Sequence, residues 1–406
     1  MKKISLLGVC LLTGFSAMAQ AYLVKDAEHM LKDSNPDYKK ALETIKPALT
    51  NPETAETMMP WYLAGKANVG VYDEGLLQES LGNHMDNPKK LEVGHALVDA
   101  YNAYFKALHL DSVPDAKGKI KPKKSKEILK NMAGSYPQLR NAGIFLLQAQ
   151  DYKGAYDAWE LYVTLPENPV MGKSAPVADP DSAVGEIMYY QAASMLSVNE
   201  DQKALDKLRQ AEAKGYTPVD VYTYAVEAAR RLNDTTTMVE YAEKGYNKYG
   251  TEEISFIGQL INAKLASNDY AACYDYVNRA IEITPAENVS MLSQLYDIKG
   301  YILEQENKIA EAQDCFQKAV DLDPKNAKGY FDLGRIIYNK ALKLDEESNN
   351  TQTDAVKTQL LEAADLFKKA FELDEQGMSQ IPNILYRLYY RLGAGYEQEA
   401  DTWKLM

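Results

Sequence analysis

Histidine, tryptophan and cysteine are scarce in this sequence of 406 residues, which holds 4, 3 and 3 of them. The four histidines are scattered over separate segments, and none has the His-Glu-x-x-His spacing of a zinc hydrolase: His29, His84, His95 and His109. A Gly-x-Ser-x-Gly nucleophile motif and a phosphate-binding glycine loop are also lacking. We therefore expect a protein that is not an enzyme and that uses no cofactor and no metal.

The low cysteine content excludes a disulfide-rich scaffold. Cys273 and Cys315 are the only cysteines after residue 10. Both fall in helical patterns, at positions that usually hold small or apolar packing residues. We expect buried free thiols, with a disulfide between the two as the alternative, which would need close and correctly aimed Cβ atoms.

No run of apolar residues is long enough to span a bilayer. Leu6–Phe15 is a short apolar run that follows two lysines and precedes Ala17–Ala19, which is typical of a secretory signal peptide. We expect residues 1–19 to be such a signal, with export to the periplasm, and a secreted or envelope-associated protein is the alternative. The alternatives are a buried first helix and lipidation at Cys10.

Positive charge is in the minority, with 45 Lys and Arg against 58 Asp and Glu, a formal net charge of −13. Phosphate backbones are repelled by such a chain, so we expect no nucleic-acid partner. Seven lysines between residues 117 and 130 are the exception. This segment is typical of a solvated linker that runs into a helix. The alternative is a patch for an acidic partner or an anionic glycan.

Hydrophobic residues make up 46% of the chain, enough for a large core. Residues 293–326 carry the clearest pattern, which is that of two short helices joined by a turn and closed by a proline. Its marker residues are Tyr296, Gly300, Leu303, Ala312, Phe316, Ala319 and Pro324, with the turn at Asn307-Lys308. One such unit cannot bury its own apolar face, so we expect the rest of the chain to repeat it.

This motif resembles the tetratricopeptide repeat family, and the chain is more loosely similar to exported repeat proteins of Gram-negative bacteria. The resemblance implies an all-α fold, a right-handed solenoid of antiparallel helix pairs. Weaker copies of the pattern give eight units, at 22–48, 61–110, 136–168, 185–216, 219–250, 254–287, 293–326 and from 327 onward. Two units carry insertions, around 71–90 and 343–358, and a single capping helix is expected from Ile384 to about Thr402.

The expected domain organisation follows the quality of the repeats. After the signal peptide it runs 20–112 for N-terminal units, 113–126 for the Lys-rich linker, 127–250 for degenerate units, 251–378 for the best-preserved units and 379–406 for the cap. The long connections 112–125 and 166–182 are candidate hinges or ordinary surface loops.

The resemblance also implies that ligands, usually peptides or proteins, lie in a concave groove lined by the first helix of each pair. Helical periodicity predicts which residues face that groove: Tyr189; Asp297, Tyr301 and Gln305; Lys328, Phe331, Arg335, Tyr338 and Asn339; and Tyr386, Arg387, Tyr390 and Arg391. Aromatic and arginine side chains often carry binding energy at protein contacts. The alternative is that the tyrosines pack between repeats, since the chain has 29 of them.

These observations predict an exported, non-catalytic scaffold that binds a protein or peptide through its groove. The Lys and Asn clamp with which some family members grip chaperone tails is not present. One alternative is a structural component of a cell-envelope complex that uses its convex face or insertions, and another is a glycan- or anion-binding protein. Three strings also resemble a bacterial O-glycosylation sequon, with unmodified loops as the alternative: 111–113, 181–183 and 234–236. The oligomeric state stays open.

Overall fold

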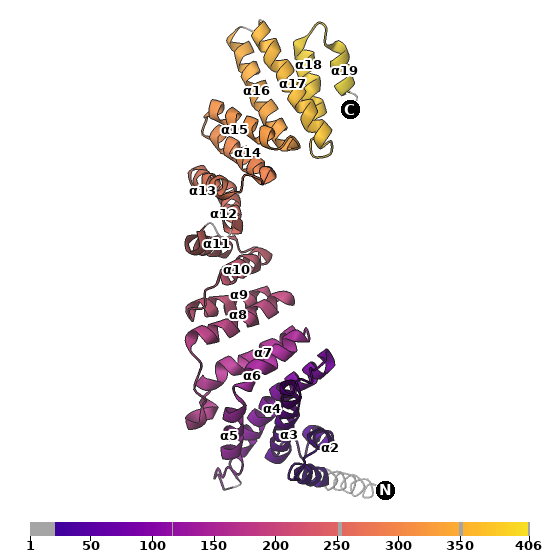
Figure 1. The fold of residues 1–406 in the computed structure, drawn as a ribbon, viewed down its shortest axis with the longest axis vertical. Helices are drawn as coiled ribbons and strands as arrows, with labels where there is room; N and C mark the ends of the chain where they lie inside the picture. Colours follow the sequence, from indigo (N-terminus) through magenta and orange to yellow (C-terminus); the bar gives the residue numbers. More distant parts are fainter. Residues whose placement is uncertain (1–20, 116, 251–253, 349–351, 405–406) are drawn as a thin grey trace, which may run out of the picture. The chain divides into compact units, whose positions relative to one another are not determined.

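The computed structural model describes residues 21–115, 117–250, 254–348 and 352–404. Over these ranges the chain is α-helical and contains no strand, which confirms the predicted fold class (Figure 1). It divides into two compact units, unit 1 up to Asp234 and unit 2 from Thr235. None of the helices in these ranges is long and apolar enough to cross a membrane. The expected signal peptide lies outside the described residues.

The described part of unit 1 holds helical residues 21–30, followed by nine α-helices and two short 3-10 helices. Their bounds are α2 Tyr38–Thr50, α3 Met58–Ser80, α4 Asn87–Asp111, α5 Ser125–Ser135, α6 Gln138–Gln148, α7 Tyr152–Thr164, η1 Leu165–Glu167, η2 Pro169–Ser174, α8 Asp181–Ser197, α9 Asp201–Ala213 and α10 Val219–Arg231. One hydrophobic cluster runs from Ala27 to Ile187 and includes fully buried Trp159. Each helix therefore places its apolar side against its neighbours in the chain.

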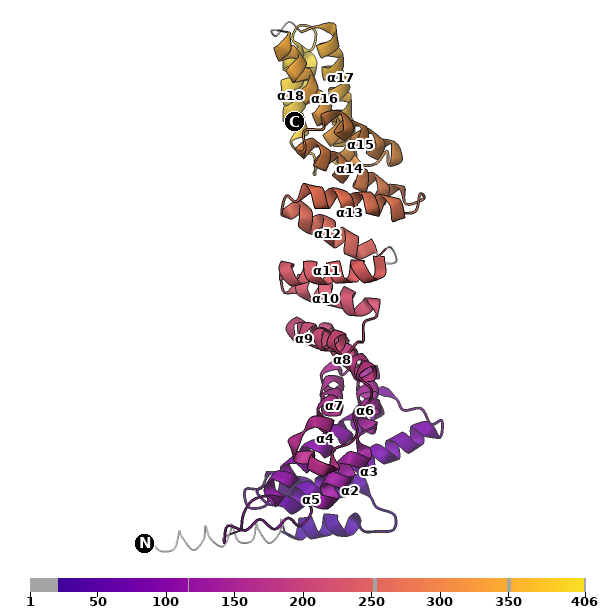
Figure 2. The same cartoon turned by 90° about the vertical axis from the view of Figure 1, so that its left-hand side faces the viewer.

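Nine α-helices make up the described part of unit 2. Their bounds are α11 Thr235–Tyr249, α12 Ile254–Ala266, α13 Tyr270–Ile283, α14 Val289–Gln305, α15 Ile309–Leu322, α16 Ala327–Glu347, α17 Asp354–Leu373, α18 Ile381–Leu392 and α19 Glu397–Lys404. Helices α11, α12 and α13 follow one another as successive layers (Figure 2). Two successive helices are present at each of the eight positions where the sequence predicted a repeat.

The turn between α14 and α15 lies at Asn307, as the sequence predicted, and other helix pairs have turns of the same kind. Five residues other than glycine have a positive φ of 56° to 64°, and each precedes a second helix: Gln150, Asn199, Asn233, Asn268 and Asn307. Asparagine tolerates this left-handed conformation better than most residues, so four of the five turns use it. Asp151 and Asp269 follow directly and accept the first free backbone N–H groups of α7 and α13.

The marker residues of 293–326 have the packing roles that the motif implies. A Cβ atom added at Gly300 would come within 2.7 Å of the Phe316 ring, so only glycine lets α15 approach α14 this closely. Ala312, Phe316 and Ala319 are fully buried. These residues fold the unit, and none of them is available to a partner.

Three expectations about the longer segments need correction or refinement. The insertion around 71–90 lengthens both helices of its pair, α3 and α4, and the insertion around 343–358 likewise lengthens α16 and α17. The cap is two helices, α18 and α19, because Gly393 takes a φ of +74° and ends α18. Helix α5 is additional to the repeats and starts within the Lys-rich segment, at Ser125.

Candidate functional site

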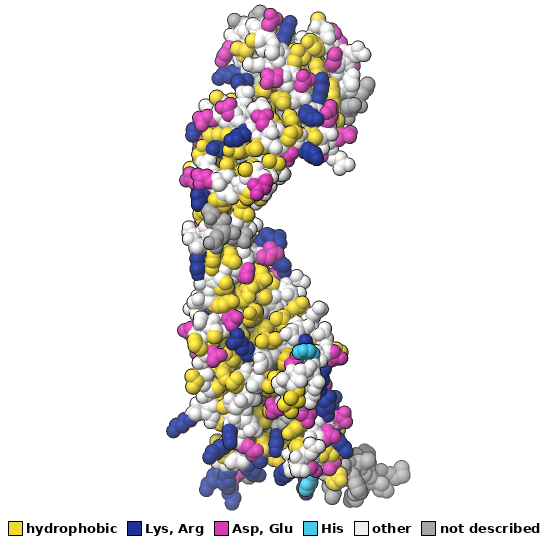
Figure 3. Space-filling view, in the orientation of Figure 1, with side chains coloured by type: hydrophobic (Ala, Val, Ile, Leu, Met, Phe, Trp, Pro, Cys, Tyr) yellow, Lys and Arg dark blue, Asp and Glu magenta, His cyan; other side chains and the backbone are white. Residues whose placement is uncertain are grey.

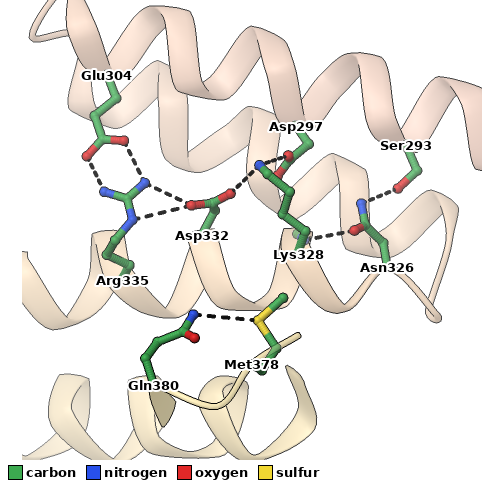
Figure 4. A network of polar contacts seen from close by, with 10 residues as sticks. Ser293, Asp297, Glu304, Asn326, Lys328, Asp332, Arg335, Met378 and Gln380 are labelled. Carbon is green, nitrogen blue, oxygen red and sulfur yellow. Dashed lines mark hydrogen bonds and ion pairs between the residues drawn. The ribbon is translucent and has the colours of Figure 1, made fainter. Parts of the chain in front are cut away.

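Helices α14 and α16 are the first helices of successive pairs, and a network of charged side chains joins them (Figure 4). Asp297 and Glu304 come from α14, and Lys328, Asp332 and Arg335 come from α16. We call the surface that α14, α16 and α18 share the first-helix face of unit 2. Three carboxylates and two cations meet here, which gives these five side chains a formal charge of −1.

Lys328 links the two helices at one end of the network. Its ammonium group donates to a carboxylate oxygen of Asp297 and, at 2.7 Å, to Asp332. Burial raises the pKa of Asp297 to about 6, because Lys328 offsets only part of the lost hydration and Asp332 adds repulsion. The two carboxylates raise the pKa of Lys328 despite its partial burial. The lysine therefore stays charged while its side chain is 61% exposed.

Arg335 links the same helices about two turns further along, seven residues after Lys328. Its guanidinium pairs with both carboxylate oxygens of Glu304, at 2.5 and 2.7 Å, and also donates to Asp332 at 3.0 and 3.3 Å. Bidentate pairs of this kind fix orientation as well as distance. Asp332 is thus held between Lys328 and Arg335, and the face is ordered by contacts within the protein.

The start of α16 is fastened to the preceding pair by neutral groups. The side-chain oxygen of Asn326 caps α16 by accepting the Gly329 N–H at 2.9 Å, and the side-chain NH₂ group of Asn326 donates to the Ser293 hydroxyl at 2.8 Å. Ser293 is buried and donates to the Ala319 carbonyl at 2.6 Å. This chain of bonds fixes where α16 begins relative to α14 and α15.

A second ion pair joins α16 to α18. Arg391 donates to one oxygen of Asp345 from Nε at 3.1 Å and from an Nη at 2.8 Å. Asp345 is only 2% exposed, and its other oxygen has no hydrogen-bond partner within the described residues. Gln352 donates to the Arg391 carbonyl. Ion pairs therefore connect α14 to α16 and also α16 to α18.

Several residues that the sequence assigned to the groove serve the fold instead. Asp297 is 3% exposed, so the expectation that it faces a ligand is wrong, because its carboxylate is turned toward Lys328. Phe331 and Tyr338 are half-buried and contact Phe367 of α17, with ring centroids 5.7 and 6.3 Å apart. Their contacts lie largely inside their own helix pair.

Other predicted residues remain exposed on the first helices. Tyr301 is 38% exposed and meets Tyr270 edge to face, at 6.3 Å between centroids. Gln305 and Asn339 are exposed on α14 and α16. On α18, Arg387 is exposed, Tyr390 is 74% exposed and Tyr386 is half-buried, while Arg391 is held by Asp345. These exposed side chains are the ones that a partner could reach.

Sequence reasoning missed Glu304 and Asp332, the two acids that organise the arginine. A usable signal was present, since Asp332 lies four residues after Lys328 and three before Arg335, the spacings at which helical side chains meet. The pairing with Glu304 depends on the approach of another repeat. No periodicity within one helix can reveal such a contact.

Tyr189 lies in unit 1, whereas the other predicted groove residues lie in unit 2. Its ring packs among Tyr190, Tyr216 and Tyr224, with centroids 5.5 to 5.7 Å away. Burial and a hydrogen bond with Tyr224 raise the pKa of Tyr189. Tyr190 donates to Glu186, which pairs with Arg140 of α6 at 2.8 Å. Helix α8 thus meets α10 through aromatic rings and α6 through an ion pair.

The Lys-rich segment is held by acids. The Asp111 carboxylate accepts the backbone N–H groups of Lys123, Lys124 and Ser125 at 2.8 to 3.0 Å. Asp115 accepts those of Lys117 and Lys119 and pairs with Lys121. Three backbone amides at the start of α5 are therefore already occupied. Four lysines and three acids line the cavity beside them, of about 770 Å³.

The remaining candidate positions give simpler results. Cys273 and Cys315 are free, so the disulfide alternative is wrong, and burial raises the pKa of Cys273 to about 11, which keeps its thiol protonated. Ser112, Ser182 and Thr235 of the sequon-like strings are exposed. No cluster of His, Cys, Asp and Glu with the geometry of a metal site occurs among the residues that the structure describes.

Comparison with known proteins gives one family and several structural neighbours. No curated protein matches the chain in sequence. Solved structures similar to parts of it include the C-terminal part of a TPR repeat-containing protein from Cytophaga hutchinsonii, with 12% identity, 65% of this chain and 92% of that chain covered, and a TM-score of 0.42. PilF from Pseudomonas aeruginosa is 12% identical, with 56% of this chain and 91% of that chain covered and a TM-score of 0.39. MamA from Desulfovibrio magneticus is 17% identical, with 48% of this chain and 97% of that chain covered and a TM-score of 0.34.

The family assignment rests on sequence and architecture together. The model of the tetratricopeptide repeat matches residues 293–326, which are helices α14 and α15 and the turn between them. Helix pairs of the same kind precede and follow this unit along the chain. Residues 293–326 are therefore a tetratricopeptide repeat, and it lies within an all-α repeat scaffold of successive helix pairs.

Proposed function

We propose that this protein is an exported scaffold that binds a protein or peptide segment on the first-helix face of unit 2. The observation that carries the proposal is the pair of ordered cations, Lys328 and Arg335, each held by buried carboxylates. Exposed Tyr301, Gln305 and Asn339 lie on the same two helices. Together they form a surface of polar and aromatic groups that needs little reorganisation to bind.

The hydrogen-bonding capacity of the cations supports this function. An ammonium group has three donors and a guanidinium has five. Within the described residues Lys328 uses two, toward Asp297 and Asp332, and Arg335 makes four hydrogen bonds. One donor on each remains for a ligand. Because the side chains are already ordered, binding costs little further conformational entropy.

The charge of the network favours a neutral acceptor over an anion. Asp297, Asp332 and Glu304 outnumber the two cations, so a carboxylate of the ligand would gain little attraction. A main-chain carbonyl accepts the same hydrogen bonds without that repulsion. The proposed ligand is therefore a polypeptide segment held by its backbone, with Tyr301 as an apolar contact.

The test is affinity capture from an envelope extract with quantitative mass spectrometry. We compare the unmodified chain with a Gln305→Arg, Asn339→Arg variant, whose exposed positions lie outside the network. Gln317→Arg on the second helix α15 is the matched control. We expect the partner to be lost from the double variant and retained by the control. Retention by both would reject this face as the binding site.

Export is a separate part of the proposal and rests on the signal-like residues 1–19. N-terminal sequencing of the chain recovered from an envelope fraction is expected to begin at Gln20. Recovery of a cytosolic chain that begins at Met1 would contradict it. This outcome would leave the proposed binding face untouched.

A further inference from the structure

Unit 1 already holds an extended, proline-bearing segment of its own chain. Residues 175–180 connect η2 to α8 without regular secondary structure and contain Pro176 and Pro180. The backbone angles are φ −57° and ψ 131° at Ala175 and φ −52° and ψ 145° at Pro180. These values are near those of a polyproline II helix.

This segment lies beside a stacked pair of tyrosines. The rings of Tyr136 and Tyr162 are 4.9 Å apart between centroids and within 3° of parallel. The Tyr162 hydroxyl donates to Asp179. Pro176 and Val177 line the same cavity as both rings, of about 480 Å³. The segment and the two rings therefore face one cavity, and the Tyr162 hydroxyl donates to the segment across it.

A second tyrosine pair in unit 1 has similar geometry. Tyr189 of α8 and Tyr224 of α10 are 5.6 Å apart between centroids and within 15° of parallel, and both are half-buried. Tyr190 and Tyr216 extend the aromatic surface on either side of Tyr189. On the face drawn in Figure 3, hydrophobic side chains, a class that includes tyrosine, gather over α8 to α10.

We propose that the Tyr189–Tyr224 pair binds a proline-containing extended segment of a partner protein. Such segments fit aromatic surfaces and lose little entropy on binding, because they are extended before they bind. Since the pKa of Tyr189 is raised, its hydroxyl stays protonated at neutral pH. The site lies in unit 1, so it stands or falls independently of the face proposed for unit 2.

The charges near the pair restrict the partner further. Glu186 accepts from Tyr190, and Asp220 raises the pKa of both Tyr189 and Tyr216 through its negative charge. The nearby cations Arg140 and Lys214 are paired with Glu186 and Asp181. A segment with acidic residues beside its prolines is therefore repelled. The favoured partner carries neutral or basic residues between its prolines.

The test is a fluorescence anisotropy titration of the full chain with a labelled, uncharged peptide of proline and alanine. A peptide with serine in place of proline is the ligand control, and one with aspartate beside the prolines tests the charge preference. Tyr189→Leu and Tyr224→Leu are compared with Tyr390→Leu, an exposed tyrosine of unit 2. We expect saturable binding of the uncharged proline peptide, weakened at least about tenfold by the two unit 1 substitutions, and unchanged by Tyr390→Leu.

Two further results decide between this site and an indirect effect. A photoreactive version of the proline peptide should label α8 or α10 in the unmodified chain, a readout that does not depend on how the variants fold. Absence of saturable binding, equal binding of the serine peptide, or labelling confined to other helices would each overturn the proposal. Tighter binding of the aspartate peptide would overturn the charge preference.

Discussion

The first helices of the two units are joined by different chemistry on the same architecture. In unit 1, α8 and α10 meet through the rings of Tyr189 and Tyr224. In unit 2, α14 and α16 meet through a network of carboxylates and cations around Asp332. The cores beneath follow one rule in both units, with a bulky ring against a glycine: Trp159 on Gly143 and Phe316 on Gly300.

This difference shows which part of a repeat is free to vary. Packing within a pair requires small residues opposite large ones, so it recurs along the chain. The face between first helices needs only some compatible contact, and aromatic rings or ion pairs both serve. Ion pairs respond to salt and pH, whereas stacked rings do not. The two units should therefore respond differently to solution conditions.

Core truncation should affect the two units equally and most strongly. Phe316→Ala in unit 2 and Trp159→Ala in unit 1 each remove a fully buried ring, and we expect a loss of about 3–5 kcal/mol in the free energy of unfolding of the unit concerned. Hydrogen exchange resolved by helix measures it. Loss in one unit only would show that the cores are not equivalent.

Removal of Arg335 should destabilise unit 2 in a way that depends on salt. Arg335→Ala leaves Glu304 and Asp332 without their shared cation, so we expect a loss of about 2 kcal/mol in unit 2, smaller in high salt. Denaturant titrations at low and high salt test this, with Arg387→Ala, an exposed arginine, as control. If the loss in the free energy of unfolding were the same at both salt concentrations, Arg335 would stabilise unit 2 by packing and not by its charge.

The aromatic counterpart should be weaker and insensitive to salt. Tyr189→Leu keeps apolar volume but removes the ring contacts with Tyr190, Tyr216 and Tyr224, and we expect unit 1 to lose about 1 kcal/mol. The same titrations measure it at both salt concentrations. A loss as salt-dependent as that of Arg335→Ala would abolish the distinction between the two faces.

The smallest expected effect is on the pH dependence of unit 2. The pKa of Asp297 is about 6 in the folded protein against an ordinary value of 3.8, because its carboxyl is buried beside Lys328 and Asp332. The folded state therefore binds the proton more tightly, and the stability that this group contributes is complete below about pH 4 and is lost as pH rises through 6.

Asp297→Asn provides the comparison for that titration. Between pH 7 and pH 5 we expect the unmodified unit 2 to gain stability relative to the Asn variant, as thermal unfolding at each pH would measure. Unit 1 should respond alike in both proteins, because the substitution lies in unit 2. If the unmodified unit 2 instead lost stability relative to the Asn variant over this range, the ion pair with Lys328 would outweigh the effect of burial on Asp297.

The fold was largely predictable from the sequence, because repeat cores depend on local spacing. The turns at Asn268 and Asn307 and the packing of Gly300 on Phe316 follow from residues close in the chain. The break at Gly393 was missed because the helical pattern of α18 seemed to continue beyond it. A glycine signals such an end only when the backbone takes a positive φ.

The candidate site was less predictable, because its contacts cross from one repeat to the next. Helical periodicity identified Lys328 and Arg335 correctly as residues of the first helix, but it could not supply Glu304 as the partner of Arg335. Asp297 was expected to be exposed and is buried. Whether a side chain at such a position meets a ligand or a neighbouring repeat depends on the distance between helices, which no single repeat encodes.

The most direct test of the central claim places a photoreactive amino acid at Gln305, on the first-helix face of unit 2, and in a second protein at Gln317 of α15. Both positions are exposed and lie in the same repeat. The account predicts that the partner captured by the unmodified chain crosslinks from position 305 and not from 317. Crosslinking from 317 alone would place the partner on the second helices and contradict the proposed binding face.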